Sequence, residues 1–426
     1  MTTVAVIGGG ISGLVAAYRL SRAGCRVTVF EGSDRVGGKL RSATLGSRTV
    51  DVGAEAFLRR RPEVMDLAAE LGLADQVVSP VGRRPLVYAG GTLRPFEPRS
   101  VMGIPGFGRE VDAPLAWRRD EDVSLGGFVR SRLGDEVVAR SVDPMVSGVY
   151  AAHADDVSLR AAVPAVAARL DAGAPSLTAA VTDVLSAGTG AGPVFGAFRG
   201  GYQVLLDALV RRLRGSVVLG APVGELRPGW MLRGWLFDEV VLAVPPSQAA
   251  RLTRSHAPEL ARLLAGVPAA DSAMVSLAFG DDVDFPDASG VLVASGEVLT
   301  AKAFTLSTQK WGAGVRPGNV VRVSMGRLGV SRAVELPDDE LVAIARADLA
   351  AAVGVDATPV AATVQRWYQG IPVYTPGHLQ RVAEIEAATP QGLTLVGAYF
   401  DGVGVPACVA RADRAVARLL QRRVAG

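Results

Sequence analysis

Three glycines near the amino terminus have the spacing of a phosphate-binding turn. Gly8, Gly10 and Gly13 form G-x-G-x-x-G directly after the apolar run Val4–Ile7. In such a turn the first glycine lets the chain reverse, the second lets the backbone approach a pyrophosphate, and the third lets the following helix pack on the strand. The start of that helix offers unpaired N–H groups to an anion. The spacing therefore predicts a strand, a nucleotide-binding turn and a helix.

An acidic residue stands where a bound dinucleotide would place a ribose. The second apolar run, Arg26–Phe30, ends at Glu31, a position from which a carboxylate accepts hydrogen bonds from ribose hydroxyls. Glu31 would repel a 2′-phosphate, which argues against NADP. We therefore expect a dinucleotide site that extends from the glycine turn to Glu31. The alternative is a tight turn between strand and helix that binds no ligand.

A second glycine pair distinguishes FAD from NAD as the expected dinucleotide. Arg35, Gly37, Gly38 and Lys39 follow Glu31, and a simple NAD-binding fold has no need of them. The glycines permit a close approach of the cofactor, and the cations can neutralise its phosphates. The pattern resembles the extended FAD motif of the flavin amine oxidase superfamily. The alternative interpretation is a surface turn.

Composition excludes several classes of protein. Of the 426 residues, 49% are hydrophobic and 20% are charged, and the net charge is +3. Large cores can form, and the basic excess is too small to indicate nucleic-acid binding. The two cysteines and three histidines are scattered, which predicts neither a disulfide framework nor a metal site. We expect no signal peptide and no membrane-spanning helix, hence a cytoplasmic protein, with peripheral membrane contact as an alternative.

Hydrophobic periodicity predicts a mixed α/β fold with three interleaved parts. A Rossmann-like FAD-binding domain would alternate along the chain with a β-sheet substrate domain and a helical subdomain. The apolar faces of the helical subdomain are expected to form a core, with contact to a membrane surface as the alternative. The expected divisions are FAD-binding segments at 1–75, 198–254 and 366–426, a hairpin plus helical subdomain at 76–197, and the substrate domain at 255–365.

Motifs along nearly the whole chain resemble the coproporphyrinogen/protoporphyrinogen oxidase family, within the flavin amine oxidase superfamily. They are "VIGGGISGLVAAYRL", "DVGAEAFL", "DPMVSGVYAAHADDVSLRAA", "FRGGYQVLLDAL", "TQKWG", "PVYTPGHL" and "GVGVPACVA". The compact form, with "VMGIPG" at 101–106, is most similar to the Gram-positive branch that oxidises coproporphyrinogen III. The chain differs from the common family pattern at Arg411-Ala412, where Ser-Gly is usual, and at Val373, where Gln is usual.

The resemblance implies FAD contacts at positions spread over the chain. The pyrophosphate would be held by Gly8, Gly9, Gly10, Ile11, Ser12 and Gly13, the adenosine ribose by Glu31, and the phosphates and ribitol would be bordered by Arg35, Gly38 and Lys39. The flavin ring would lie along Gly53, Ala54, Glu55 and Ala56, with adenine at Val223, Trp367 near the ring, and a C-terminal contact at Gly397, Gly404, Val405 and Pro406.

The resemblance also implies a reaction. Coproporphyrinogen III would lose six electrons in three steps of haem biosynthesis, with flavin N5 accepting hydride and O2 reoxidising the flavin to give three H2O2. Protoporphyrinogen IX oxidation is the alternative, and another flavin amine oxidase or desaturase, or a non-enzymatic FAD-binding protein, is less favoured. No residue pattern identifies a general base. Glu55 is the one titratable residue expected near the ring, and hydrogen bonding to the ribityl chain or the backbone explains it equally well.

Substrate charge predicts cations around the pocket. Coproporphyrinogen III carries four propionates and protoporphyrinogen IX carries two, and arginine binds carboxylates through two parallel hydrogen bonds. Arg60 and Arg61 follow the flavin-facing segment at a predicted helix start, where the helix dipole disfavours cations. Together with Arg84 they are the expected anchors, Lys302 and Lys310 are weaker candidates, and a solvated surface charge is the alternative for each. The expected partners are the porphyrinogen, O2 and, transiently, a ferrochelatase.

Overall fold

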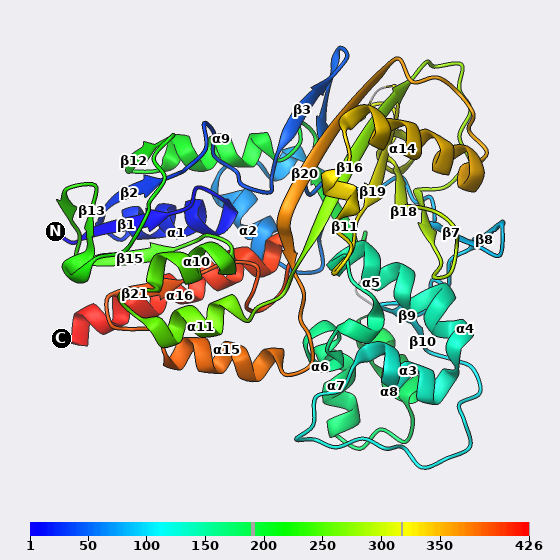
Figure 1. The fold of residues 1–426 in the computed structure, drawn as a ribbon, viewed down its shortest axis with the longest axis horizontal. Coiled ribbons are helices and arrows are strands. Elements are labelled where there is room, and N and C mark those ends of the chain that lie inside the picture. Colours follow the sequence, from blue (N-terminus) through cyan, green and yellow to red (C-terminus); the bar gives the residue numbers. More distant parts are fainter. Residues whose placement is uncertain (189–191, 317, 426) are drawn as a thin grey trace.

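The computed structural model describes residues 1–188, 192–316 and 318–425. Figure 1 shows a nucleotide-binding half that contains both ends of the chain, a large sheet beside it, and a group of helices below that sheet. The chain passes between these parts several times. This arrangement confirms the expected mixed α/β class and the interleaving of its parts.

The nucleotide-binding half is built on a parallel sheet of five strands. Their order is β12 (Gly215–Val218), β2 (Arg26–Phe30), β1 (Thr3–Ile7), β15 (Glu239–Leu242) and β21 (Leu393–Leu395). The inner strands β1, β2 and β15 are short and almost wholly apolar, as strands covered on both faces should be. Segments far apart in the sequence therefore meet in one sheet, in a Rossmann-like order.

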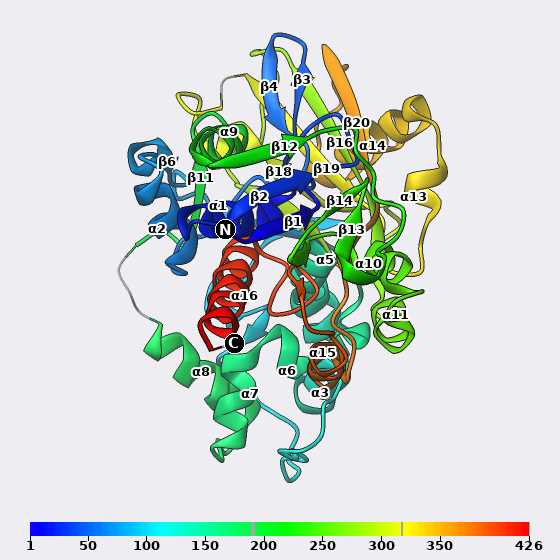
Figure 2. The ribbon, with the colours of Figure 1, turned by 90° about the vertical axis from the view of Figure 1, so that its left-hand side faces the viewer.

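Helices cover both faces of this sheet because side chains alternate along each strand. In β1, Val4 and Val6 pack with one group of helices, whereas Ala5 and Ile7 pack with the other. The first group is α1 (Ile11–Arg22), α2 (Glu63–Glu70), α9 (Gln203–Arg212) and α16 (Val405–Ala425), and the second is α10 (Pro246–Thr253), α11 (Pro258–Ala265) and α15 (His378–Ala387). Figure 2 shows α2 and α11 on opposite sides of the molecule.

A seven-stranded sheet forms the second part. Its order is β20 (Ala361–Pro372), β16 (Ala269–Phe279), β19 (Asn319–Met325), β18 (Ala301–Leu306), β17 (Gly290–Val293), β7 (Leu86–Ala89) and β8 (Thr92–Pro95). Helix α14 (Asp338–Val353) packs against it. The sheet does not follow the expected divisions. The hairpin β7–β8 pairs with β17 and so leaves the helical part, and β20 runs across the expected boundary at 365.

The third part is a bundle of helices whose apolar faces form a core of their own. It contains α3 (Leu125–Leu133), α4 (Asp135–Val137), α5 (Asp143–Tyr150), α6 (Leu159–Ala162), α7 (Pro164–Asp171) and α8 (Leu177–Ala187). Within the expected helical subdomain, residues 189–191 lie outside the described part of the chain. Helix α5 packs on β17 and β18, which joins the bundle to the large sheet. Among the described helices, none is long and apolar enough to cross a membrane.

Short elements connect these parts. The hairpin β3–β4 (Ser42–Leu45 and Arg48–Asp51) projects beside β20, and β5 (Phe57–Leu58), β11 (Phe195–Phe198) and β6 (Val77–Val78) form a small sheet. The other short elements are β9 (Ser100–Val101), β10 (Ile104–Pro105), β13 (Met231–Leu232), β14 (Trp235–Leu236), α12 (Ser307–Trp311) and α13 (Arg332–Glu335).

Candidate functional site

The turn between β1 and α1 has no room for a side chain at two of its glycines, Gly8 and Gly13, but has space beside the third, Gly10. A Cβ atom on Gly8 would lie 2.5 Å from the carbonyl oxygen of Ala243, and one on Gly13 would lie 2.0 Å from the carbonyl oxygen of Gly8. A Cβ on Gly10 would meet nothing closer than the Cα of Gly38, at 4.0 Å. The first two glycines are required by packing within the protein. The space over Gly10 is available to a ligand that approaches the backbone.

Helix α1 begins beside this open space. Gly10 is its N-cap residue, no side chain caps it, and its first turn contains no acidic residue. The N–H groups of Ile11, Ser12 and Gly13 have no acceptor within the helix. They are therefore free to donate to a phosphate, and the helix dipole favours an anion there.

Glu31 is held next to the turn by two backbone donors. The Gly9 N–H donates to Oε2 of Glu31 at 2.7 Å, and the Ser33 N–H donates to Oε1 at 2.8 Å. The Ala221 N–H donates to the Glu31 carbonyl at 2.8 Å, which places the segment that contains buried Val223 beside the carboxylate. This arrangement fits an adenosine, with its ribose at Glu31 and its base near Val223.

The second glycine pair packs directly on the first motif. The Gly37 N–H donates to the carbonyl of Gly9 at 2.8 Å, and a Cβ on Gly38 would lie 3.2 Å from the Cα of Gly10. The guanidinium of Arg35 donates to the carbonyls of Val36, Gly38 and Leu40 at 2.9–3.3 Å. Arg35 thus fixes the shape of the loop with its own donors.

Lys39 is different from Arg35. Its ammonium group makes no hydrogen bond or ion pair with any residue that the structure describes, and burial lowers its pKa. It lies in the electrostatic field of Cys408, in the first turn of α16, and Cys408 in turn lies beside Ser12 of α1. Lys39 is therefore a cation without a protein partner near the starts of two helices, which is an arrangement suited to the phosphates of a dinucleotide.

The segment 53–56, called the ribbon below, follows β4 and lies against β20. A Cβ on Gly53 would lie 1.9 Å from the carbonyl oxygen of Lys39 and 3.3 Å from the ring of Trp367. The Nε1–H of Trp367 donates to the carbonyl of Val52 at 3.3 Å. The ribbon therefore fits closely between the second glycine pair and the large sheet. Ala54 and Ala56 leave its neighbouring positions small.

The loop before α16 completes the expected cofactor site. Gly397 has a φ of +149° and lies after β21, at the same edge of the parallel sheet as the first glycine turn. A Cβ on Gly404 would meet only Pro406, at 3.7 Å, and Val405 begins the helix. Contacts between these segments therefore connect the residues expected to hold FAD. The open space over Gly10, the starts of α1 and α16, and the unpartnered Lys39 fit an extended dinucleotide.

The side chain of Glu55, the acidic residue of this ribbon, lies in a network of charges. Its Oε1 accepts the hydroxyl hydrogen of Ser307 at 2.8 Å, and its Oε2 lies 3.4 Å from Nζ of Lys310 and 3.4 Å from Nη1 of Arg322. Burial alone would raise the pKa of this carboxyl, but Arg322 and Lys310 outweigh burial and hold the pKa at about 2. Glu55 is ionised and fully paired, which favours a role as a hydrogen-bond partner over a role as a proton acceptor.

Sequence reasoning missed Arg322 and Ser307. Arg322 also donates to the carbonyl of Gly53, so one side chain of β19 holds both the ribbon and its acidic residue. The available signal was an arginine inside the apolar run Val320–Met325, because a buried charge requires a partner. A cavity of about 280 Å³ adjoins this network, lined by Arg316, Arg322, Asp51 and their neighbours.

The arginines expected to bind substrate are not gathered at one place. Arg61 pairs with Glu63 in the first turn of α2, at 2.5 Å, which offsets the unfavourable interaction with the helix dipole. Arg59 donates to Oγ of Ser79 at 2.6 Å. Arg60 and Arg84 are exposed, and neither side chain makes a hydrogen bond or ion pair with a described residue. Of the weaker candidates, Lys310 pairs with Glu55, and Lys302 is buried in β18.

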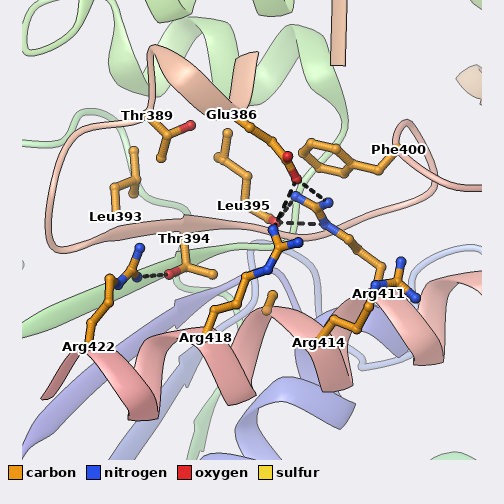
Figure 3. A pocket seen from close by; sticks show the side chains of 11 residues that line it. Glu386, Thr389, Leu393, Thr394, Leu395, Phe400, Arg411, Arg414, Arg418 and Arg422 are labelled. Carbon is orange, nitrogen blue, oxygen red and sulfur yellow. Dashed lines mark hydrogen bonds and ion pairs between the residues drawn. The ribbon is translucent and has the colours of Figure 1, made fainter. Parts of the chain in front are cut away.

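Arg411, one of the departures from the family pattern, is an interior residue of the nucleotide-binding half. Its guanidinium lies over the ring of Phe400 at 3.7 Å and pairs with Glu386 at 2.5 Å (Figure 3). Arg418 points toward the same carboxylate, and Arg422 donates to Thr394. The adjoining cavity of about 110 Å³ contains none of the residues expected to bind FAD. Arg411 therefore joins α16 to α15.

Comparisons with known proteins agree with this geometry. The family of flavin-containing amine oxidoreductases matches residues 11–420. The coproporphyrinogen III oxidase of Mycobacterium tuberculosis is 46% identical, over 98% of this chain and 97% of its own length. The protoporphyrinogen oxidase of Bos taurus is 29% identical, over 98% of both chains. A solved Exiguobacterium structure, described as a candidate protoporphyrinogen oxidase, superposes with a TM-score of 0.86 at 26% identity and covers 99% of both chains.

The glycine turns, Glu31, the ribbon and the two helix starts thus occur in a chain that is similar to flavin-dependent oxidases over almost its full length. FAD is the cofactor that this combination requires. The chain belongs to the flavin-containing amine oxidoreductase family, in its branch of coproporphyrinogen III oxidases.

Proposed function

We propose that this FAD-dependent oxidoreductase converts coproporphyrinogen III to coproporphyrin III with O2 as electron acceptor. The observation that carries the proposal is the 46% identity, over 98% of the chain, to enzymes named for that substrate. Three successive steps each remove a hydride from carbon and a proton from the macrocycle. Each step reduces one O2 to H2O2, so six hydrogens leave the substrate and three H2O2 form.

In this proposal the protein positions the cofactor and excludes alternative chemistry. Bound FAD supplies the hydride acceptor and its reoxidation by O2. The first turns of α1 and α16 bind the phosphates together with Lys39, and Glu31 binds the ribose. Arg322 fixes the ribbon through Gly53 and Glu55. Glu55 is ionised and fully paired, so it is not the proton acceptor in this proposal. The protons released by the substrate pass to water or to the pyrrole nitrogens of the substrate.

Protoporphyrinogen IX oxidation is the second candidate because one full-length relative, from Bos taurus, is named for it. The higher identity to the coproporphyrinogen III enzymes favours the first candidate. Arg60 and Arg84 remain our proposed carboxylate contacts, since both are exposed and unpaired among the described residues. Arg61 is a weaker contact because Glu63 already compensates its charge. Cytoplasmic location, peripheral membrane contact and transient contact with a ferrochelatase stay predictions.

The proposal is tested with FAD-loaded protein and coproporphyrinogen III in air. We expect porphyrin fluorescence to rise, with three H2O2 released for each porphyrin formed. Under argon, the same substrate should bleach the flavin absorbance without accumulation of H2O2. FAD-stripped protein is the control for spontaneous oxidation. A flavin that binds normally but is not bleached by coproporphyrinogen III would refute the proposed reaction.

A further inference from the structure

Lysine is rare in this chain, and none of its lysines is exposed on the surface. Only three of the 45 basic residues are lysines. Lys39 lies near the starts of α1 and α16, Lys310 pairs with Glu55, and Lys302 lies in β18. The other 42 of the 45 basic residues are arginines, and all three lysines are at least partly buried. Two of the three have a role in the cofactor site, and Lys302 does not.

Lys302 is buried without a counter-ion. It is 2% exposed, and its Nζ donates to the carbonyl of Gly326 at 2.7 Å. No carboxylate of the described residues lies within 4.0 Å of it. Burial, together with the nearby charge of Arg327, lowers the pKa of Lys302 to about 7. An ammonium group with one carbonyl partner keeps two donors free, and burial without an anion is costly.

Arg327 is a second cation beside Lys302 that lacks a paired carboxylate. It is half-buried, its Nε donates to Oγ of Ser147 in α5 at 2.9 Å, and burial lowers its pKa. Asp143 is the acid in its electrostatic field, but the oxygens of Asp143 already accept from His153, Ser295 and the Ala154 N–H. Among the described residues, neither Arg327 nor Lys302 has a charged nitrogen within 4.0 Å of an Asp143 oxygen.

The pair lies across the large sheet from the flavin-facing ribbon. Gly53 contacts Trp367 of β20, and Trp367 pairs with Ser272 of β16. A Cβ on Gly326 would lie 3.0 Å from the Cα of Ser272, and Lys302 donates to the carbonyl of Gly326. Contacts between neighbouring strands therefore connect the ribbon, through β20, β16 and the end of β19, to Lys302 in β18. The span is three strand spacings of about 4.8 Å, roughly 14 Å.

Helix α5 connects the same pair to the C-terminal cofactor loop. The hydroxyl of Tyr374 donates to the carbonyl of Ala398, next to Gly397. The rings of Tyr374 and Tyr150 lie 5.5 Å apart, and Tyr150 ends the helix that carries Ser147. Lys302 and Arg327 thus lie where α5 meets the large sheet, and Tyr150 and Tyr374 link α5 to the loop that contains Gly397.

We propose that Lys302 and Arg327 together bind one carboxylate of the substrate at the junction of α5 and the large sheet. The inference rests on the proposed function for the identity of the macrocycle that carries the carboxylate. The planar guanidinium and the compact ammonium supply the remaining donors for its two oxygens. The bound anion compensates the buried charge that the protein itself leaves unpaired. Lys302 is a substrate-binding residue in this assignment, and Ser147 positions Arg327.

The test is binding of coproporphyrin III and of its tetramethyl ester to FAD-loaded protein, followed by porphyrin fluorescence in a mild detergent. We expect Lys302→Met to weaken binding of the free acid by roughly 30-fold or more, as for one partner lost from a buried ion pair. Binding of the ester should change by less than about threefold, a factor worth under 1 kcal/mol. Arg418→Met is the control, because Arg418 is a cation of α16 that lines a separate cavity beside Glu386. It should preserve the preference for the free acid.

Flavin content and melting temperature show whether each variant folds, and Arg327→Gln provides an independent variant with the same expected loss of preference. Equal weakening of acid and ester by both variants would overturn the inference. So would an unchanged preference for the free acid in both variants, because loss of a carboxylate contact must lower that preference. These measurements need no turnover. A protein that oxidises only protoporphyrinogen IX would refute the proposed function and still report on this carboxylate site.

Discussion

The guanidinium of Arg322 lies 3.4 Å from the carboxylate of Glu55 and couples the large sheet to the cofactor ribbon. The two residues come from different parts of the fold, β19 and the segment after β4. Arg322 also donates to the carbonyl of Gly53, so it holds the ribbon at both its backbone and its side chain. A shift of the sheet relative to the nucleotide-binding half would break both contacts.

Glu55→Gln should destabilise the protein by about 3 kcal/mol at pH 7, the value of a pKa held 2.5 units below its usual one. The folded pKa of Glu55 is about 2, below the unfolded value of 4.5. Its stabilisation is therefore complete above pH 4.5 and is lost as the pH falls toward 2. Urea unfolding should show a difference between wild type and variant that is large at pH 7 and smaller at pH 3. Equal differences at both pH values would contradict the pairing.

Gly10→Ala should separate folding from cofactor binding. The added methyl meets no protein atom closer than 4.0 Å, so the melting temperature of the FAD-free protein should change little. It occupies the space expected for the pyrophosphate, so FAD affinity should fall by at least about ten-fold, or ~1.4 kcal/mol. Gly314→Ala, at an exposed position with no neighbour within 4 Å, is the control. Unchanged FAD affinity in Gly10→Ala would place the cofactor elsewhere.

His378 should make stability depend on pH in mildly acidic solution. It is fully buried and stacks on Tyr374 at 3.9 Å, and burial lowers its pKa to about 4 from 6.5. Between pH 6.5 and 4, His378 is therefore protonated in the unfolded chain but remains neutral in the folded protein. Stability is full above pH 6.5 and falls by about 3 kcal/mol as the pH drops to 4.

His378→Phe keeps a stacked ring and removes the titration. Denaturant midpoints of this variant should fall less steeply than those of wild type between pH 6.5 and 4. Gly314→Ala, at an exposed position with no neighbour within 4 Å, adds no titratable group and should retain the wild-type slope. A parallel decline in wild type and His378→Phe would show that other groups cause the acid sensitivity.

Arg411→Met should destabilise the nucleotide-binding half by about 1–3 kcal/mol, in the range of mutations that break a buried ion pair partly open to water. The variant loses the contact with Phe400 and leaves Glu386 with the more distant Arg418. Arg418→Met, at a site that is 64% exposed on the same helix, should cost less than about 0.5 kcal/mol. Chemical denaturation of both variants checks the order, and similar losses would contradict the interior role of Arg411.

The sequence predicted the parts of the site that are local in the chain. The first glycine turn, Glu31 and the second glycine pair lie within one β–α–β unit, where spacing alone decides the geometry. The Glu55–Arg322 pair was missed because 267 positions separate its members, and only the sheet brings them together. The guanidinium of Arg35 was expected to face phosphates, whereas it bonds to carbonyls of its own loop.

The expected division of the chain placed the hairpin β7–β8 with the helical subdomain, whereas it pairs with β17 of the large sheet, for a similar reason. The alternating residues of β7 and β8 predict a hairpin correctly but do not specify its neighbour. Parallel pairing of Leu86 with Val291 joins segments about 200 residues apart, and no local pattern encodes that choice. Likewise, no spacing in the sequence shows that Glu63 compensates Arg61 or that Lys302 is buried without an anion.

A comparison of turnover on two substrates tests the proposed reaction most directly. FAD-loaded protein is given coproporphyrinogen III or protoporphyrinogen IX under identical aerobic conditions, and porphyrin fluorescence is followed from the first seconds. We expect a higher kcat/KM for coproporphyrinogen III, by at least about ten-fold, since one additional paired carboxylate is worth ~1.4 kcal/mol or more. An equal or higher kcat/KM for protoporphyrinogen IX would contradict it.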